Sequence, residues 1–433
     1  MCPTVSSSRS YPRSYLCSFV GSFMRSSLSR WLAAISLSVF LTACGGGSSG
    51  SDSSSSNSGG SNSNSGNTPS AQPIAATASN TVAITVGPGA ENFVNIPNVT
   101  VTVCAPGTSN CQTINNIQVD TSSYGLRLAS DAAAQIVSSL PINASIIGGQ
   151  LTECTQFADG FTWGTVRTAD VKIGGETASS IPIQMVGDLP DSTVPPDDCI
   201  SGGSLTTSKQ LGANGILGVG VAPTDCGVTC ANAATSNYYA CTAGTNCTAV
   251  AVEVASQVVN PVTKFAVDNN GVIVQLPPVA TAAASVTGTL VFGIGTQSNN
   301  ALTDATLFTS TGFGDLTGTY KGAAVTTIID SGSNGLFFTD SSLPSCASTF
   351  YCPASPQALS TTVSGLSGTT GTVNFTVNNE QTLAAGGTNY ALNGLAGSIG
   401  SSPTLFDLGL PFFFGRHVYV GFATQSNTPY VAF

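Results

Sequence analysis

The chain has 433 residues, of which only 7% are charged and 41% are hydrophobic. This length suits two or three ordinary domains. The low charge, together with 48 glycines and 22 prolines, excludes coiled coils and helical repeats. The formal net charge is −10. Such an excess of acid does not suit a surface that neutralises phosphates, so we expect no nucleic-acid partner.

Residues 1–43 have the features of an export signal. Basic residues precede an apolar run, 31–41, which is too short to span a bilayer but suits the hydrophobic core of a signal peptide. The sequence Leu-Thr-Ala-Cys that ends at Cys44 resembles a bacterial lipobox, in which the cysteine is lipidated and becomes the new N-terminus. The alternative is an ordinary cleaved signal in which Cys44 is incidental. Met1 and Met24 are both candidate start residues.

A tether is predicted after Cys44, over residues 44–79. Residues 45–67 consist of Gly, Ser and Asn, with Asp52 the one exception. A stretch of this composition cannot offset its ordering entropy by burying apolar surface, so we expect a flexible coil. Because Gly45 follows the cysteine, the pattern resembles that of lipoproteins sorted to the outer membrane. We therefore expect a lipid-anchored protein of the bacterial cell envelope, at the outer membrane.

Ten of the 13 cysteines lie beyond Cys44. In an exported chain, an even number of closely spaced cysteines favours disulfides. Four pairs are suggested by proximity and a fifth by elimination, although the sequence does not fix the connectivity: Cys104–Cys111, Cys226–Cys230, Cys241–Cys247, Cys346–Cys352 and then Cys154–Cys199. The alternative is a zinc site formed by the four cysteines between 226 and 247, which is less favoured outside the cytosol.

From about Thr77 onward, short β-branched runs alternate with Gly, Pro, Asn and Ser, which predicts an all-β architecture. The predicted strands are residues 82–86, 99–103, 114–119, 171–173, 272–276, 289–294, 325–329, 371–377 and 417–422. One helix is predicted over residues 130–140, an alanine-rich piece that Pro141 would stop. Nothing in this body resembles a second linker, so we expect any second lobe to pack closely against the first.

An internal duplication lies within this body. Residues 117–126 and 328–336 each run from an apolar strand into Asp, a hydroxyl residue, a small residue, Ser and a Gly-Leu step. The two aspartates, Asp120 and Asp330, are 210 positions apart. A single Asp-Ser-Gly-Ser is most often an ordinary turn. Two matching copies instead suggest two similar lobes, each of which offers one carboxylate to a shared cleft.

Two further features accompany the duplicated motif: an apolar run that ends in glycine after each copy, and a predicted hairpin after the first copy. Each copy is followed by an apolar run that ends in a bare glycine, Gly218 in the first case and Gly409 in the second. Such a glycine allows another backbone to approach closely. Between Asp120 and Gly218, residues 161–175 have the pattern of a hairpin with an aromatic residue, Trp163, near its tip.

Together these motifs resemble the pepsin-like aspartic proteases. That family has apolar-apolar-Asp-Thr/Ser-Gly-Ser/Thr and an apolar-apolar-Gly partner in each lobe, and a flap hairpin that bears an aromatic residue. The match runs in the family's order from about residue 80 to Phe433, and the chain is also similar to a group of bacterial lipoproteins with this fold. The resemblance implies an all-β, bilobal pepsin-like (acid protease) double barrel with pseudo-two-fold symmetry. Its N-terminal lobe, with the flap, would be residues 80–300, and its C-terminal lobe residues 301–433.

The resemblance also implies roles for individual residues. Asp120 and Asp330 would form the catalytic pair, since two facing carboxyl groups share one proton. The ionised member would take a proton from a bound water that attacks a peptide carbonyl, and the protonated member would stabilise the oxyanion. The residues that would support the pair carry a hydroxyl or lack a side chain: Thr121, Ser123, Ser331, Gly332 and Ser333. Trp163 and Gly164 would form the flap over a peptide or protein substrate. No cofactor and no metal are implied, and we expect a monomer.

Three residues depart from the family pattern. Ser122 stands where the family has glycine, Arg127 stands near a position usually held by an aromatic that supports the flap, and Asp407 interrupts the second apolar-apolar-Gly. These departures keep a second hypothesis open: a non-catalytic protein of the same fold that binds an extended peptide or an envelope polymer. A third is a disulfide-rich surface protein whose motifs are coincidental.

Other chemistries are less favoured by the sequence. His417 is the only histidine, and a Ser-His-Asp triad would depend on it entirely. The chain has no Gly-x-x-x-x-Gly-Lys motif that could bind phosphates.

Overall fold

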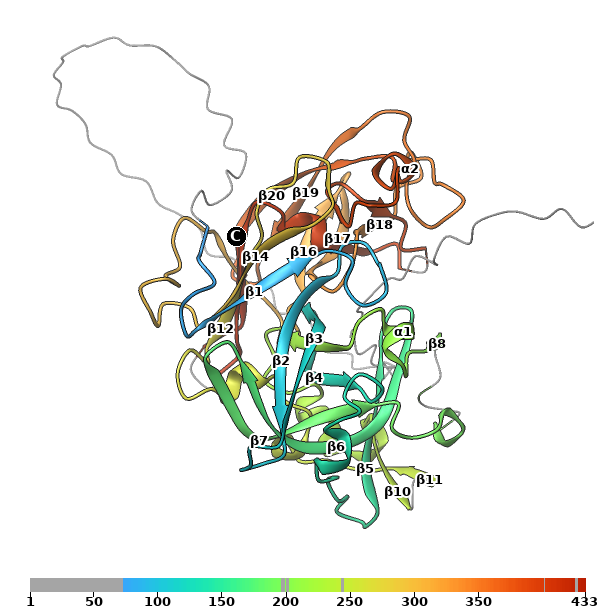
Figure 1. Cartoon of the computed structure of the whole chain (residues 1–433). Helices are drawn as coiled ribbons and strands as arrows, with labels where there is room; N and C mark the ends of the chain where they lie inside the picture. Colours follow the sequence, from blue (N-terminus) through green and yellow to red (C-terminus); the bar gives the residue numbers. More distant parts are fainter. Residues whose placement is uncertain (1–72, 196–198, 200–201, 243–244, 401, 425–426) are drawn as a thin grey trace, which may run out of the picture.

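The computed structural model describes residues 73–195, 199, 202–242, 245–400, 402–424 and 427–433 (Figure 1). The expected export signal, the lipidation site Cys44 and nearly all of the expected tether therefore lie outside the described residues. Within those ranges, no helix is long and apolar enough to cross a membrane.

The described chain is built almost entirely of β-strands. Its two α-helices have four residues each, α1 at Ser208–Leu211 and α2 at Glu380–Leu383. The other helical pieces are short 3-10 turns: Val137–Ser139, Asp191–Thr193, Gly227–Ala231, Ala233–Thr235, Val254–Ser256, Pro261–Lys264 and Leu410–Phe413. The all-β class expected from the short β-branched runs is confirmed, and each predicted strand lies on a strand of the structure.

A closed six-stranded barrel forms the first lobe. Its strands are β2 (Pro97–Cys104), β3 (Cys111–Asp120), β4 (Tyr124–Ala129), β6 (Gly160–Ile173), β7 (Glu176–Val186) and β9 (Gly215–Val219). The order around the barrel is β6-β7-β4-β9-β3-β2, and β2 pairs again with β6. Beyond β6, the sheet continues through three strands, and a fourth pairs with β6: β5 (Gln150–Gln156), β10 (Tyr238–Thr242), β11 (Thr245–Ala249) and β8 (Gly203–Ser204).

A separate seven-stranded sheet forms the second lobe. Its strands are β16 (Leu316–Tyr320), β17 (Ala323–Ile329), β18 (Leu336–Phe338), β19 (Gln357–Ser364), β20 (Thr370–Val377), β22 (Ala396–Gly397) and β23 (Leu405–Leu408). They are ordered β20-β19-β16-β17-β23-β18-β22. Buried aromatic side chains fill its core, where the rings of Phe338 and Phe406 stack with their centroids 4.8 Å apart.

A third group of strands joins the two lobes. It comprises β1 (Thr81–Val86), β14 (Val286–Phe292), β12 (Gly271–Gln275), β24 (His417–Gly421), β25 (Tyr430–Ala432) and β15 (Leu307–Thr309), paired in that order. Strand β1 also pairs with β2 of the barrel. Two short strands, β13 (Ala282–Ala283) and β21 (Ala391–Leu392), pair separately. In Figure 1, β1, β12 and β14 run between the green first lobe and the orange-red second lobe.

The two lobes repeat one local topology. In the first lobe, β3 is parallel to β9 while β4 is antiparallel to β9. In the second lobe, β17 is parallel to β23 while β18 is antiparallel to β23. The duplicated sequence therefore folds twice into the same arrangement, and the two aspartates end equivalent strands.

The predicted helix over residues 130–140 is wrong. The segment forms a series of turns and the 3-10 turn Val137–Ser139. The Ala129 carbonyl accepts hydrogen bonds from the N–H groups of both Ala132 and Ala133. In addition, the side chain of Gln112 on β3 donates to the Ala132 carbonyl and accepts from the Gln135 N–H. The neighbouring strand thus takes backbone groups that a regular helix would need for itself.

All five expected disulfides are present in the structure. They are Cys104–Cys111, Cys154–Cys199, Cys226–Cys230, Cys241–Cys247 and Cys346–Cys352. The alternative zinc site is therefore rejected, because its four cysteines are paired with each other. The same reason excludes a metal site at Cys346, Cys352 and Glu380, whose ligand atoms lie close together.

Candidate active site

The two aspartates of the duplicated motif come together in the structure. Asp120 is the last residue of β3, and Asp330 directly follows β17. Both side chains are fully buried, and each carboxyl group is close enough to act on the ionisation of the other. A strand that ends at the lobe interface and then turns sharply presents its carboxyl group there, and the repeated topology does so from both sides.

Each carboxyl group is held by its own loop. The Oδ1 atom of Asp120 accepts hydrogen bonds from the backbone N–H groups of Ser122 (2.8 Å) and Ser123 (3.2 Å), and its Oδ2 atom accepts one from the Ser123 hydroxyl (2.5 Å). Asp330 repeats this pattern with the backbone N–H of Gly332 (2.8 Å) and the hydroxyl of Ser333 (2.9 Å). These donors fix the orientation of both carboxyl groups.

Thr121 and Ser331 tie the two loops together across the lobe interface. The Thr121 hydroxyl donates to the Ile329 carbonyl (2.7 Å) and accepts from the Ser331 N–H (2.9 Å). Reciprocally, the Ser331 hydroxyl donates to the Val119 carbonyl (2.8 Å) and accepts from the Thr121 N–H (3.1 Å). Because all four bonds are buried and cross between lobes, the separation of the carboxyl groups is set by the fold itself.

The central residue of each loop differs between the lobes. A Cβ atom added to Gly332 would lie 2.7 Å from the Asp120 Cγ atom, so only glycine fits there without movement. The equivalent residue of the first lobe is Ser122, which carries a Cβ and is partly exposed. The second loop therefore leaves no room for a side chain, whereas the first accommodates one.

Burial and mutual repulsion govern the ionisation of the pair. The pKa of Asp330 is raised well above its ordinary value, by burial first, then by the negative charges of Asp120 and Asp407. Two interacting carboxyl groups titrate as one unit rather than separately. The arrangement therefore favours a pair that holds one shared proton.

Arg127 is part of a separate buried cluster. Its Nη2 atom lies 2.7 Å from Glu153 Oε1 and 3.1 Å from Asp225 Oδ2. Its Nε donates to the Thr155 hydroxyl (3.1 Å), and its Nη1 donates to the Tyr124 carbonyl (2.6 Å). Glu153 and Asp225 therefore supply the carboxyl groups that balance the charge of the Arg127 guanidinium.

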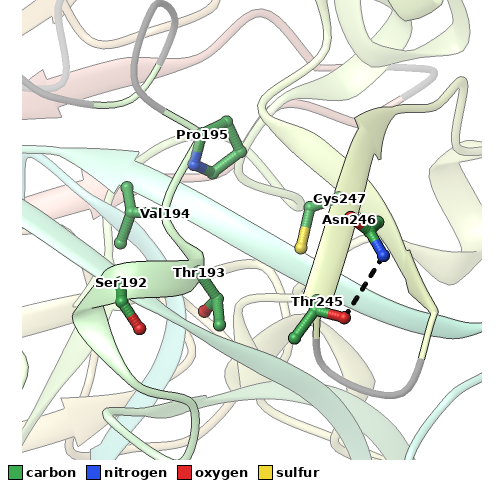
Figure 2. Close-up of a pocket in the computed structure, with 7 residues that line it drawn as sticks. All are labelled: Ser192, Thr193, Val194, Pro195, Thr245, Asn246 and Cys247. Atoms are coloured by element: carbon green, nitrogen blue, oxygen red, sulfur yellow. Dashed lines mark hydrogen bonds between the residues drawn. The ribbon is translucent and has the colours of Figure 1, made fainter.

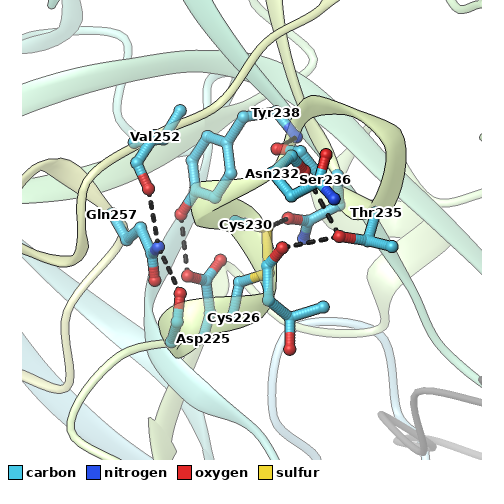
Figure 3. Close-up of a disulfide and its surroundings, with 12 residues drawn as sticks. Asp225, Cys226, Cys230, Asn232, Thr235, Ser236, Tyr238, Val252 and Gln257 are labelled. Carbon is cyan, nitrogen blue, oxygen red and sulfur yellow. Dashed lines mark hydrogen bonds between the residues drawn. A yellow bond between two sulfur atoms is a disulfide. The ribbon is translucent and has the colours of Figure 1, made fainter.

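The same cluster continues to Tyr238 on β10. Figure 3 shows the Tyr238 hydroxyl beside Asp225 and next to the Cys226–Cys230 disulfide; the hydroxyl donates to Asp225 Oδ1 at 2.7 Å. Burial would raise the pKa of Glu153, but Arg127 and its hydrogen bonds lower it overall. By contrast, burial and the charge of Glu153 raise the pKa of Asp225. In this cluster Arg127 and Glu153 therefore form an ion pair, and Asp225 beside them is neutral.

The hairpin expected over residues 161–175, with Trp163 near its tip, is wrong, because Gly160–Ile173 is the single strand β6. The turn between β5 and β6 is at residues 157–159, and Trp163 pairs with Cys154 further along the hairpin. Its side chain is fully buried, its Nε1 donates to the Thr193 hydroxyl (2.9 Å), and its ring packs edge-on against Tyr239. It supports a small core around the Cys154–Cys199 disulfide, so its assignment as the covering aromatic is corrected.

Gly164 has a packing role beside that small core. A Cβ atom at this position would lie 1.8 Å from the Met185 carbonyl oxygen. The glycine lets β6 approach β7 closely, which is why the residue lacks a side chain.

Phe157 and Asp159 occupy the turn instead. The Phe157 N–H donates to the Gly160 carbonyl (2.7 Å) and closes the turn. Burial raises the pKa of Asp159 to about 7, and its Oδ1 atom is buried with no hydrogen-bond partner among the described residues. The sequence carried a signal for this turn, since an Asp-Gly pair between strands is typical of a hairpin.

A surface pocket lies away from the paired aspartates. It has a volume of about 400 Å³ and is lined by residues 192–195 and 245–247 (Figure 2). Thr193 in its wall accepts the hydrogen bond from Trp163. The pocket therefore adjoins the small disulfide core of the first lobe, on β11 and the turn at Asp191–Thr193.

Two lobes with a repeated strand topology, each contributing one buried aspartate to a cross-linked pair, define an all-β, bilobal protein with the pepsin-like, acid-protease fold. The chain belongs to the family described as "Protein of unknown function (DUF3443)", which matches residues 76–433. Among solved structures, it is similar to the crystal structure of an aspartic proteinase from Irpex lacteus, with 18% identity over 81% of this chain and 96% of that one, and a TM-score of 0.48. No curated protein sequence matches the chain.

Proposed function

We propose that the protein is an aspartic endopeptidase of the bacterial cell envelope, anchored by a lipid on Cys44. The observation that carries the proposal is the pair formed by Asp120 and Asp330. Their carboxyl groups are buried, act on one another and are held by matching donors from two cross-linked loops. Burying two acids beside each other at an interface costs stability and gains nothing for packing, so a purely structural role does not account for them.

The pair supports hydrolysis by an activated water. With one shared proton, the ionised carboxylate accepts a proton from a water that attacks the peptide carbonyl. The protonated partner donates a hydrogen bond to the oxyanion that develops on the carbonyl oxygen. The proton then passes to the leaving amine, and the pair returns to its singly protonated state. No cofactor takes part in this scheme, and the substrate would be an extended peptide or protein segment.

Cleavage of a mixed peptide library tests this function. We expect the purified protein to cut peptides between pH 3 and 7, because the two aspartates keep their shared proton in acidic solution. A statine-type peptide should inhibit this cleavage. Asp330→Asn should abolish cleavage, while Asp340→Asn, which removes another buried carboxyl group of the same lobe, should retain it. The proposal fails if the folded wild-type protein cuts nothing at any pH, or if Asp330→Asn cuts as well as the wild type.

The anchor has its own test. In cells, radiolabelled palmitate should enter the wild-type protein, and Cys44→Ala should lose the label and move from the membrane fraction to the soluble fraction. A labelled Cys44→Ala protein would contradict lipidation at this residue.

The alternative is a non-catalytic protein of this fold that binds an extended peptide or an envelope polymer. Ser122 favours it, because a side chain stands where the second lobe has only Gly332. Wild-type protein that binds a statine-type peptide but cleaves nothing, before and after Ser122→Gly, would support this alternative.

A further inference from the structure

A third aspartate lies beside the pair. Asp407 is on β23, where it pairs with Ile328 of β17 on one side and with Phe337 of β18 on the other. The carbonyl of the next residue, Leu408, accepts the hydrogen bond from the Asp330 N–H at 3.1 Å. Asp407 is therefore one residue away from the backbone group that positions Asp330.

The surroundings of Asp407 do not suit a charge. Its side chain is fully buried, and neither carboxyl oxygen has a hydrogen-bond partner within the described part of the chain. The ion pairs of the described residues use other carboxylates: Glu153, Asp225, Asp188 and Asp340. The Ser333 hydroxyl acts on Asp407 but already donates to Asp330. A buried carboxylate without a cationic partner is costly, so this group keeps its proton well beyond the ordinary range.

The first lobe shows that packing does not require a carboxyl group here. Its equivalent residue is Ile216, which pairs with Gln118 of β3 and Arg127 of β4 as Asp407 pairs in the second lobe. Ile216 is 5% exposed and packs in an apolar cluster. Because the same place in the fold accepts an apolar side chain, the acid at 407 is better explained by its effect on the neighbouring pair.

We propose that Asp407 is a positioning residue that extends to higher pH the range in which Asp120 and Asp330 share one proton. The inference rests on the proposed peptidase function. Once the pH is high enough for Asp407 to lose its own proton, its negative charge opposes release of the last proton of the pair, because the three acids titrate as one cluster. The ionisable groups that act on Asp407 are Asp120 and Asp330; β17 and β18 present apolar residues beside it.

The electrostatics agree with this geometry. The charge of Asp407 raises the pKa of Asp330, after burial and Asp120. Burial and then the charge of Asp120 raise the pKa of Asp407 itself, while Ser333 lowers it.

The pH profile of kcat/KM tests the role of Asp407. Asp407→Asn keeps the shape of the side chain, and Asp407→Ile copies the first lobe. In both, the basic limb of the profile should move to lower pH by about one unit or more, as expected for the loss of a nearby charge, while the acid limb stays in place. Asp340→Asn should leave the basic limb where it is. An unchanged basic limb in both Asp407 variants would overturn the inference.

A second measurement does not depend on catalysis. The pH dependence of unfolding gives the number of protons exchanged on unfolding, for the wild type, Asp407→Asn, Asp330→Asn and the double variant. We expect the effect of Asp407→Asn to depend on whether Asp330 is present. If the effects simply add, the coupling is absent and the inference falls. If the effects are coupled but the wild type cleaves no peptide, only the peptidase function falls.

Discussion

At the scale of single residues, the paired site depends on small differences between two nearly identical loops. Both aspartates could be located from the sequence, because two copies of an apolar strand, Asp and hydroxyl residues are rarely accidental. The flap aromatic could not be located in this way. Trp163 is the most conspicuous aromatic between Asp120 and Gly218. However, the hairpin of β5 and β6 turns just before Gly160, and Trp163 is buried further along β6. The Asp-Gly pair at Asp159 and Gly160 would have located the turn of this hairpin better than the aromatic residue did.

Gly332→Ala should inactivate the protein without unfolding it. The new methyl group would lie 2.7 Å from the Asp120 Cγ atom, so the carboxyl group must move, and misplacement by about 1 Å can cost about 100-fold in rate. We expect kcat/KM to fall by about that factor in the peptide assay, with a circular dichroism spectrum like that of the wild type. Gly312→Ala is the matched control, since a Cβ there meets nothing within 4 Å. Equal activity of Gly332→Ala and the wild type would show that the site tolerates the displacement.

At the scale of strands and loops, an ionic cluster joins the start of the hairpin to the barrel. Arg127 on β4 contacts Glu153 and Thr155 on β5, and Asp225 beyond β9. The sequence placed Arg127 near the flap but did not reveal Glu153 and Asp225 as its partners. Partners separated by 26 and 98 positions depend on how the sheet folds, which no local pattern reveals. The predicted helix failed for a similar reason, because Gln112 from another strand takes its backbone groups.

Arg127→Met should destabilise the first lobe strongly. It leaves Glu153 and Asp225 buried together without a cation, and removal of one partner of a buried ion pair typically costs about 3–5 kcal/mol. Urea unfolding at pH 7 should show a loss of that size. Lys321→Met removes a half-exposed partner of Asp340 and should cost less than about 1 kcal/mol. A similarly small loss for Arg127→Met would mean that the cluster does not hold the hairpin strand.

At the scale of the whole molecule, strands that are distant in sequence pair with one another, and several aspartates are buried in the resulting fold. The bilobal plan could be predicted from the duplication, and the cysteine spacings gave pairs that match the five disulfides. The joining sheet could not be predicted, because β24, near the end of the chain, returns to pair with β12, and β25 pairs with β24 and β15. Several carboxyl groups are buried in this fold, among them Asp330, Asp407 and Asp225, so its stability should depend on pH.

The folded protein should be most stable in mild acid. Burial raises the folded-state pKa values of Asp330, Asp407 and Asp225, and that of Asp159 to about 7. Their stabilisation is complete below the unfolded value of about 4 and is lost as the pH rises through the folded values. Asp340 acts in the opposite sense: despite burial, Lys321 and Tyr320 lower its pKa to about 2, so its contribution is lost as the pH falls toward that value.

Urea midpoints from pH 3 to 8 check this expectation. We expect the midpoint to be highest near pH 4 and to decrease toward pH 8, with a smaller decrease in Asp407→Asn. A midpoint that rises steadily from pH 4 to 8 would contradict the account of the buried acids.

The most direct test of the central claim is whether Asp120 and Asp330 act as one unit. The measurement is kcat/KM for the best library peptide with the wild type, Asp120→Asn, Asp330→Asn and the double variant. We predict that each single substitution lowers kcat/KM by about a thousandfold or more and that the double variant is no worse, because groups that act together are not additive. If either single variant keeps activity within about tenfold of the wild type, or if the two losses add, the shared-proton pair is not the catalytic centre.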